Sequence, residues 1–161
     1  MKRLAFALAV AGMAAGVVGV AVAGSHGGGK KMMAAKGPVA ERQQAMKDIK
    51  KHFVPLVKMV KGVAPFDAAT VKKNAEVIAA KLEAAAKLFP EGSDKGDTRA
   101  KPEIWLMPEE FQAIMKTAIE KARAVGQAQT LDALKPAVMA LGGEGCKACH
   151  EKFRKPRAWS Q

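Results

Sequence analysis

The chain has 161 residues, two cysteines and a net charge of +12, which together exclude several classes of protein. Two cysteines cannot form a disulfide framework across the fold, so stability must come from a good apolar core or from a cofactor. The basic excess suits an acidic protein partner or is merely solvated; nucleic acid is not expected, because no basic stripe is interleaved with aromatic residues.

The first 23 residues have the order of a cleaved secretory signal peptide. A positively charged start is followed by apolar residues 4–20 and by the small residues 21–23. The alternative is a membrane anchor that stays in place, but a spanning helix needs about 20 strongly apolar residues, and this stretch is shorter and interrupted by glycine. We therefore expect cleavage after Ala23, a periplasmic location and no stable membrane span in the mature protein.

Residues 24–37 are rich in glycine and lysine without any period, which predicts a flexible leader. The folded domain is expected to occupy residues 38–161. From Val39 onward, apolar residues recur at spacings of three and four, which is typical of a helix, and this helix should end near Gly62. Pro55 lies inside it and is expected to bend the helix or loosen one turn.

A second helix is predicted after Asp67, whose side chain can cap the helix start. Its apolar positions continue with the same spacing to Phe89, and Pro90 ends the pattern. Residues 90–102 are dense in glycine, proline, aspartate and serine and are expected to form a surface loop. Residues 103–107 can form one turn of helix.

Pro108 suits the first position of a third helix, which Gly126 should end. A fourth helix is predicted to begin near Thr130 or Asp132, to be weakened by the glycines at 142–145 and to resume beyond them. No segment shows the alternation that is typical of a strand. Four amphipathic helices with mostly short connections predict an all-α fold, an antiparallel four-helix bundle.

The sequence Cys146-Lys-Ala-Cys149-His150 matches the pattern for covalent haem attachment. On a helix of about 100° per residue these three side chains lie close together, so two thiols can join two porphyrin vinyl groups while the imidazole reaches the iron. A thioredoxin-type pair would follow a strand. A zinc site needs about four ligands, and neither His26 in the leader nor His52, a predicted surface residue, supplies a convincing set. One covalently bound haem c is therefore predicted.

The motif lies near the C-terminus, at the end of a four-helix pattern, and this arrangement resembles the class II cytochromes c. That family comprises cytochrome c′ and its low-spin relatives, which are themselves established examples of the bundle. Residues 42–46 (Arg-Gln-Gln-Ala-Met) are similar to the family's Arg-x-x-x-apolar opening, 88–90 and 101–105 to its central stretch, and 146–154 to its C-terminal signature. The resemblance covers about residues 39–155 and implies haem bound near the C-terminal helix.

In this family the residue four positions after the arginine of the first helix faces the iron opposite the histidine, and in this chain it is Met46. The resemblance to low-spin members therefore implies His150 and Met46 as iron ligands and one-electron transfer as the function. The alternative is a high-spin, five-coordinate cytochrome c′ that binds NO or CO. Methionine is also an ordinary core filler, and periodicity alone only places Met46 on the buried face.

Arg42 lies one turn before Met46, and the resemblance implies a haem propionate as the partner of its guanidinium. The alternative is an arginine that reaches solvent at the helix end. Trp105 can pack on the porphyrin or serve only as a core plug. An acidic redox partner is expected for the basic surface, and the resemblance implies a homodimer formed through the first two helices. No catalytic residue can be assigned, so the protein is not expected to be an enzyme.

Overall fold

The computed structural model describes residues 37–156, so the predicted signal peptide and all but the last residue of the predicted leader lie outside the described residues. The regular elements in the described part are all helical. The only strand-like pairing there is an isolated antiparallel bridge between Ala100 and Arg154. In chain order the elements are α1 (Pro38–Val60), α2 (Ala68–Ala86), α3 (Glu103–Leu106), α4 (Pro108–Val125), α5 (Leu131–Ala140), the π-helix η1 (Leu141–Lys147) and α6 (Ala148–Phe153).

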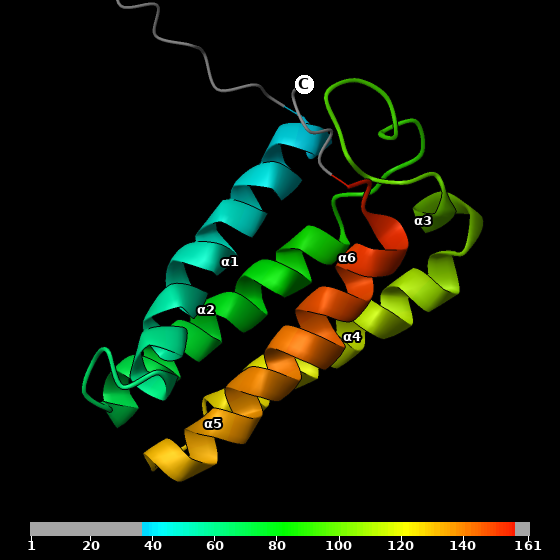
Figure 1. Cartoon of the computed structure of the whole chain (residues 1–161). Helices are drawn as coiled ribbons and strands as arrows, with labels where there is room; N and C mark the ends of the chain where they lie inside the picture. The colour runs from blue at the N-terminus through cyan, green and yellow to red at the C-terminus, as the bar shows by residue number, and fades with distance from the viewer. Residues whose placement is uncertain (1–36, 157–161) are drawn as a thin grey trace, which may run out of the picture. The chain divides into compact units, whose positions relative to one another are not determined.

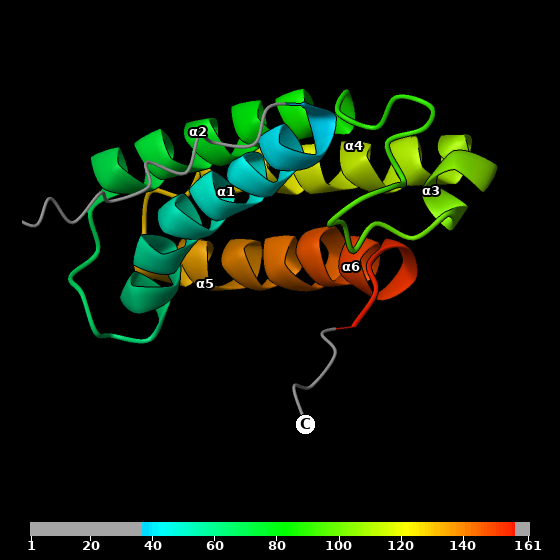
Figure 2. The same cartoon turned by 90° about the horizontal axis from the view of Figure 1, so that it is seen from above.

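The last three elements, α5, η1 and α6, follow one another without a break and form one continuous rod (Figure 1). α1 packs on α2, α2 packs on α4, and the rod packs on both α1 and α4. Figure 2 shows these four long units side by side, with α3 as a short extra turn before α4. The predicted all-α four-helix bundle is confirmed.

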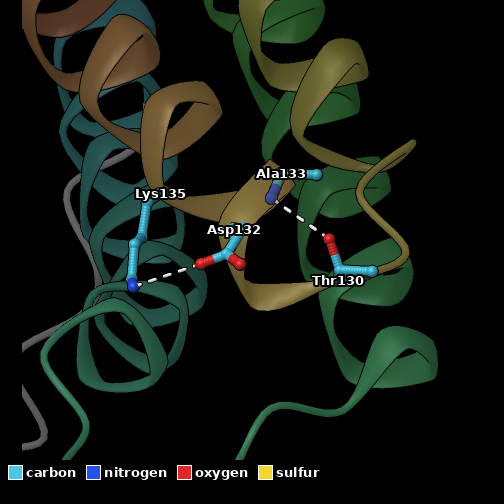
Figure 3. Close-up of polar contacts among 4 residues, drawn as sticks. All are labelled: Thr130, Asp132, Ala133 and Lys135. Atoms are coloured by element: carbon cyan, nitrogen blue, oxygen red, sulfur yellow. Dashed lines mark hydrogen bonds and ion pairs between the residues drawn. The ribbon is translucent and has the colours of Figure 1, made fainter.

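Two predicted helix starts are confirmed by their capping contacts. Oδ1 of Asp67 accepts a hydrogen bond of 2.7 Å from the backbone N–H three residues later. At the start of α5, Oγ1 of Thr130 accepts a bond of 3.2 Å from the backbone N–H of Ala133, and Lys135 lies 3.4 Å from Asp132 (Figure 3). These contacts fix the start of α5, the first element of the rod that carries the Cys-x-x-Cys-His motif.

The second helix ends earlier than predicted. α2 stops at Ala86, although the apolar spacing continues to Phe89. The Phe89 ring packs instead against Trp105 and Phe111, with centroid distances of 6.0 Å and 4.7 Å, and Phe111 packs on Phe153 at 5.4 Å. These edge-to-face aromatic contacts tie the loop after α2 to α4 and α6.

The apolar core lies along the inner faces of the four long units. α1 continues through Pro55 to Val60, and burial of the adjacent Leu56 offsets the backbone hydrogen bond that proline cannot donate. Within the part of the chain that the structure describes, no helix has both the length and the apolar character of a membrane span. The largest fully buried side chains are those of Phe153, Leu56, Ile78, Leu134, Leu141, Val71 and Val125.

Candidate haem site

The Cys-x-x-Cys-His motif lies where the rod changes from π-helix to α-helix. Cys146 is near the end of η1, whereas Cys149 and His150 are in the first turn of α6. Both cysteines are half-buried, pack against the apolar core and are not joined to each other in a disulfide. The weakening predicted at residues 142–145 is therefore a wider helical turn and not a break, and π-helical turns recur at functional sites.

Close packing of η1 on α4 depends on Gly145. A Cβ atom at this buried position would lie 3.2 Å from Cα of Ala118 and 3.3 Å from Cδ1 of Leu141. At Gly143, in contrast, a Cβ atom would have no neighbour within 4 Å. The missing side chain at Gly145 thus lets the backbone immediately before Cys146 approach α4.

Replacing Gly145 by alanine should destabilise the haem-loaded protein by about 1–3 kcal/mol, the usual cost of overpacking a filled site. Gly143→Ala is the matched control, because its new methyl group faces open space and a helical glycine is exchanged for a better helix former. Urea unfolding measures both changes. Equal free energies of unfolding for the two variants would contradict the packing role of Gly145.

Burial keeps the titratable groups of the motif neutral. It raises the pKa of the Cys146 thiol, and burial together with the neighbouring Cys146 raises the pKa of Cys149 to about 11. Burial also lowers the pKa of His150, and the positive charge of Arg99 lowers it further. At neutral pH the imidazole is therefore uncharged and retains the nitrogen lone pair that a metal ligand needs.

An open hollow of about 720 Å³ adjoins His150 at the end of the rod. The wall of this hollow is mostly cationic and therefore suits carboxylate groups, whereas the apolar side chains of the core suit the apolar porphyrin ring. Besides His150, the hollow is lined by five cations, one carboxylate and one proline, which are Arg99, Lys101, Lys147, Arg154, Lys155, Glu151 and Pro156.

Two segments far apart in the sequence build this hollow. The backbone N–H of Lys101 donates to the carbonyl oxygen of Phe153 at 2.9 Å, and that of Lys155 donates to the carbonyl oxygen of Arg99 at 2.8 Å. Both views show the loop before α3 reaching the end of α6 (Figures 1 and 2). This backbone pairing brings cations from the loop and from the C-terminal segment beside His150.

Arg42 is buried, with only 5% of its surface exposed. Its Nη1 atom donates to the carbonyl oxygen of Leu88 at 3.2 Å and to Oγ of Ser93 at 3.0 Å. Its Nη2 atom donates to the carbonyl oxygen of Ser93 at 2.6 Å and to Oγ1 of Thr98 at 2.8 Å, and the guanidinium lies 4.9 Å from the centroid of the Phe89 ring. The alternative of an arginine that reaches solvent is therefore wrong, and the guanidinium holds the loop between α2 and α3.

These four hydrogen bonds leave the Nε–H of Arg42 as the guanidinium donor for the haem propionate that the resemblance implies. Trp105 is tied to the same loop, since its Nε1 donates to the carbonyl oxygens of Phe89 at 3.1 Å and of Pro90 at 3.0 Å. The indole is half-buried against the core. These contacts favour the core-plug interpretation of Trp105.

Met46 lies on α1, where it is half-buried and packs against the core. Its role as an iron ligand stays a prediction.

His52, expected at the surface, is half-buried instead, and its Nδ1 lies 2.7 Å from Oδ1 of Asn74. Among residues 37–156, no three or more His, Cys, Asp and Glu side chains are grouped so that they could hold a metal ion.

The residues present fit a covalently attached haem. Two half-buried thiols and a neutral imidazole occur within a five-residue segment of one helical rod, and the adjoining apolar core suits a porphyrin. The family model described as Cytochrome C' matches residues 37–154. The chain belongs to the cytochrome c′ family. The resemblance to class II cytochromes c is thereby confirmed, and one covalent haem c is the cofactor of this chain, as predicted.

Individual members of the cytochrome c′ family are similar to the whole folded part of the chain. Cytochrome c′ of Alcaligenes xylosoxydans xylosoxydans is 37% identical over 122 residues, which cover 74% of this chain and 94% of the relative. The structure of cytochrome c′ from Rhodopseudomonas palustris matches with a TM-score of 0.71 and 31% identity, covering 77% of this chain and 100% of that one. A nitric oxide complex of a variant cytochrome c′ from Alcaligenes xylosoxidans matches with a TM-score of 0.68 and 33% identity, covering 74% and 94%.

The sequence alone did not reveal two parts of this cytochrome's site. The basic residues Arg99 and Lys101 in one segment and Arg154 and Lys155 in another are visible as separate charges, but no sequence signal pairs the two segments. The second missed feature is the set of loop contacts made by Arg42. The sequence left open whether Arg42 reaches solvent, and its partners lie 46 to 56 residues away.

Proposed function

We propose that this cytochrome holds haem c through thioethers from Cys146 and Cys149, with His150 as the ligand on one face of the iron. The other face binds a diatomic gas, NO or CO. The similarity to cytochromes c′ over most of the chain, including a structure with bound nitric oxide, carries this proposal. This similarity supports gas binding, which needs an open coordination position on the iron, over electron transfer through His/Met ligation. The predicted signal peptide would deliver the protein to the periplasm.

The protein groups around the haem have separate tasks. The two thioethers would fix the porphyrin to the rod, and His150, kept neutral by burial, would donate its lone pair to the iron. When bound, haem supplies the iron that takes the gas. Phe53 of α1 lies against η1, since a Cβ atom on Gly142 would be 3.7 Å from its ring. This contact places an apolar side chain of α1 against the rod.

Titration of the purified haem-loaded protein with CO and NO tests the proposed function. A five-coordinate iron should give a high-spin ferric spectrum, and the reduced protein should bind one gas molecule per haem. Optical spectroscopy follows both steps. A reduced protein that takes up neither gas at saturating concentration would overturn the proposal.

Met46 supports a second candidate function, which is one-electron transfer. The thioether of Met46 is half-buried on α1, and the family resemblance implies that this position faces the iron opposite His150. If the sulfur binds the iron, His/Met ligation closes the site and raises the reduction potential. Electron transfer would then replace gas binding as the function.

Met46→Leu separates the two candidate functions. Gas binding at an open iron predicts that the variant and the wild type share the same high-spin ferric spectrum and similar affinities for CO. A low-spin wild-type protein, whose near-infrared sulfur-to-iron band disappears in the variant, would show that Met46 is a ligand. Met59→Leu is the matched control, because Met59 is a buried methionine on the same helix and its replacement should leave the spectra unchanged in either case.

A further inference from the structure

The hollow beside His150 carries more positive charge than a haem neutralises. Five cations and one carboxylate line it, a net charge of +4. Haem has two propionates, so even if both pointed into the hollow a net charge of +2 would remain. A positive surface that can attract an acidic partner therefore remains.

The protein itself neutralises these cations poorly. Of the five, only Lys147 has an ion-pair partner within residues 37–156, which is Glu151 at 3.5 Å, and the two side chains are 68% and 67% exposed. Such an exposed pair contributes little. Lys101 donates through Nζ to a backbone carbonyl oxygen, that of Glu151, at 3.4 Å. The charge of the hollow thus remains available to a partner.

The cations also stand on a well-anchored scaffold. Arg99 follows Thr98, whose Oγ1 accepts a hydrogen bond of 2.8 Å from the buried Arg42. The segment from Arg99 to Lys101 is then paired through its backbone with the chain after Phe153. The backbone that carries these cations is therefore already ordered before a partner docks.

We propose that this hollow is the docking site for the acidic face of a one-electron donor protein that reduces the haem iron. The inference rests on the proposed haem function, because CO binds ferrous iron and the iron must be reduced first. The donor loses one electron and ferric iron becomes ferrous, while no bond forms or breaks. His150 forms part of the wall, so a donor protein seated there lies beside the ligand of the iron, as electron transfer to the haem requires.

Reduction by a probe protein tests the site. A plant-type [2Fe–2S] ferredoxin, which is a small acidic one-electron donor, is mixed in reduced form with the ferric cytochrome in a stopped-flow instrument. The test variant combines Lys101→Glu and Lys155→Glu. The matched control combines Lys58→Glu and Lys61→Glu. It makes the same change in net charge at the C-terminal end of α1, away from the hollow. Lys147→Gln with Lys155→Gln is a second test pair, should the first fold poorly.

At low ionic strength the second-order rate constant should fall about ten-fold or more in the test variant and much less in the control, and salt should slow the wild type more than the test variant. Calorimetric titration with oxidised ferredoxin should show weaker binding to the test variant than to the wild type or the control, and this readout requires no haem reduction. Equal rates and affinities for the two variants would overturn the docking site. If the test variant alone loses haem, the cations bind the propionates. If the wild type and the control bind anionic vesicles and the test variant does not, the cations bind a membrane. Either result would overturn the proposal. A protein without haem would fail the proposed function separately.

Discussion

Replacing Cys146 and Cys149 together by alanine should yield an exported protein without haem. Neither thioether can form in this variant, and His150 alone would leave the porphyrin free to dissociate. The variant should also unfold more easily, by about 3 kcal/mol or more, because a cofactor bound only by the folded chain stabilises it and its space would be left poorly packed. Visible absorption and urea unfolding, compared with the wild type, measure the two effects.

The single variants Cys146→Ala and Cys149→Ala are the matched controls. Each retains one thiol on the rod and should keep haem through acid–acetone extraction, because one thioether suffices to hold it covalently. A double variant that retained haem through this extraction would show that neither cysteine is the attachment point. An unchanged free energy of unfolding would show that haem is not part of the packed bundle.

Replacing Arg42 by lysine should destabilise the haem-loaded protein by at least about 2 kcal/mol. The guanidinium donates to three residues of the loop, Leu88, Ser93 and Thr98, and an ammonium group cannot reproduce that planar set of donors. Acceptors left unpaired in a buried site cost about 1–3 kcal/mol each. Urea unfolding gives the free energy, and amide hydrogen exchange over residues 88–98 should become faster.

Arg123→Lys is the control for that substitution, because Arg123 is an exposed arginine paired with Glu83 at 2.6 Å. A surface pair of this kind contributes about 0–1 kcal/mol, so the control should unfold almost like the wild type. If Arg42 served only a haem propionate, Arg42→Lys would change the haem spectrum or potential and leave exchange in the loop unaltered. That result would contradict its role in holding the loop.

Helix starts were predictable because their causes are local. Asp67 and Thr130 accept hydrogen bonds from N–H groups three residues away, and Pro108 needs only the first position of its helix. The end of α2 was not predictable from spacing, because Phe89 continues the apolar pattern while its ring packs against Trp105 and Phe111. Local signals therefore located the helices, and tertiary packing decided where one of them stops.

The haem motif was predictable as far as its residue types and spacing, but not in its local geometry. Glycines at 142–145 indicate a weak helix in any sequence, whereas the observed π-helical turn depends on how closely Gly145 approaches Ala118 on another helix. In the same way, the helical spacing placed Arg42 one turn before Met46, but it gave neither the burial of the guanidinium nor its partners. A propionate was implied only by the family, whereas Ser93 and Thr98 come from a loop whose path depends on the whole bundle.

Tryptic digestion of the purified protein followed by mass spectrometry tests covalent haem attachment most directly. Trypsin cuts after Arg123, Lys147 and Lys152, while the bond between Lys135 and Pro136 resists it, so Cys146 and Cys149 fall on the separate peptides 124–147 and 148–152. If both thiols are joined to one porphyrin, the two peptides remain together as one species with the mass of both plus one haem. Recovery of the two as separate peptides with free thiols would contradict a haem held by Cys146 and Cys149.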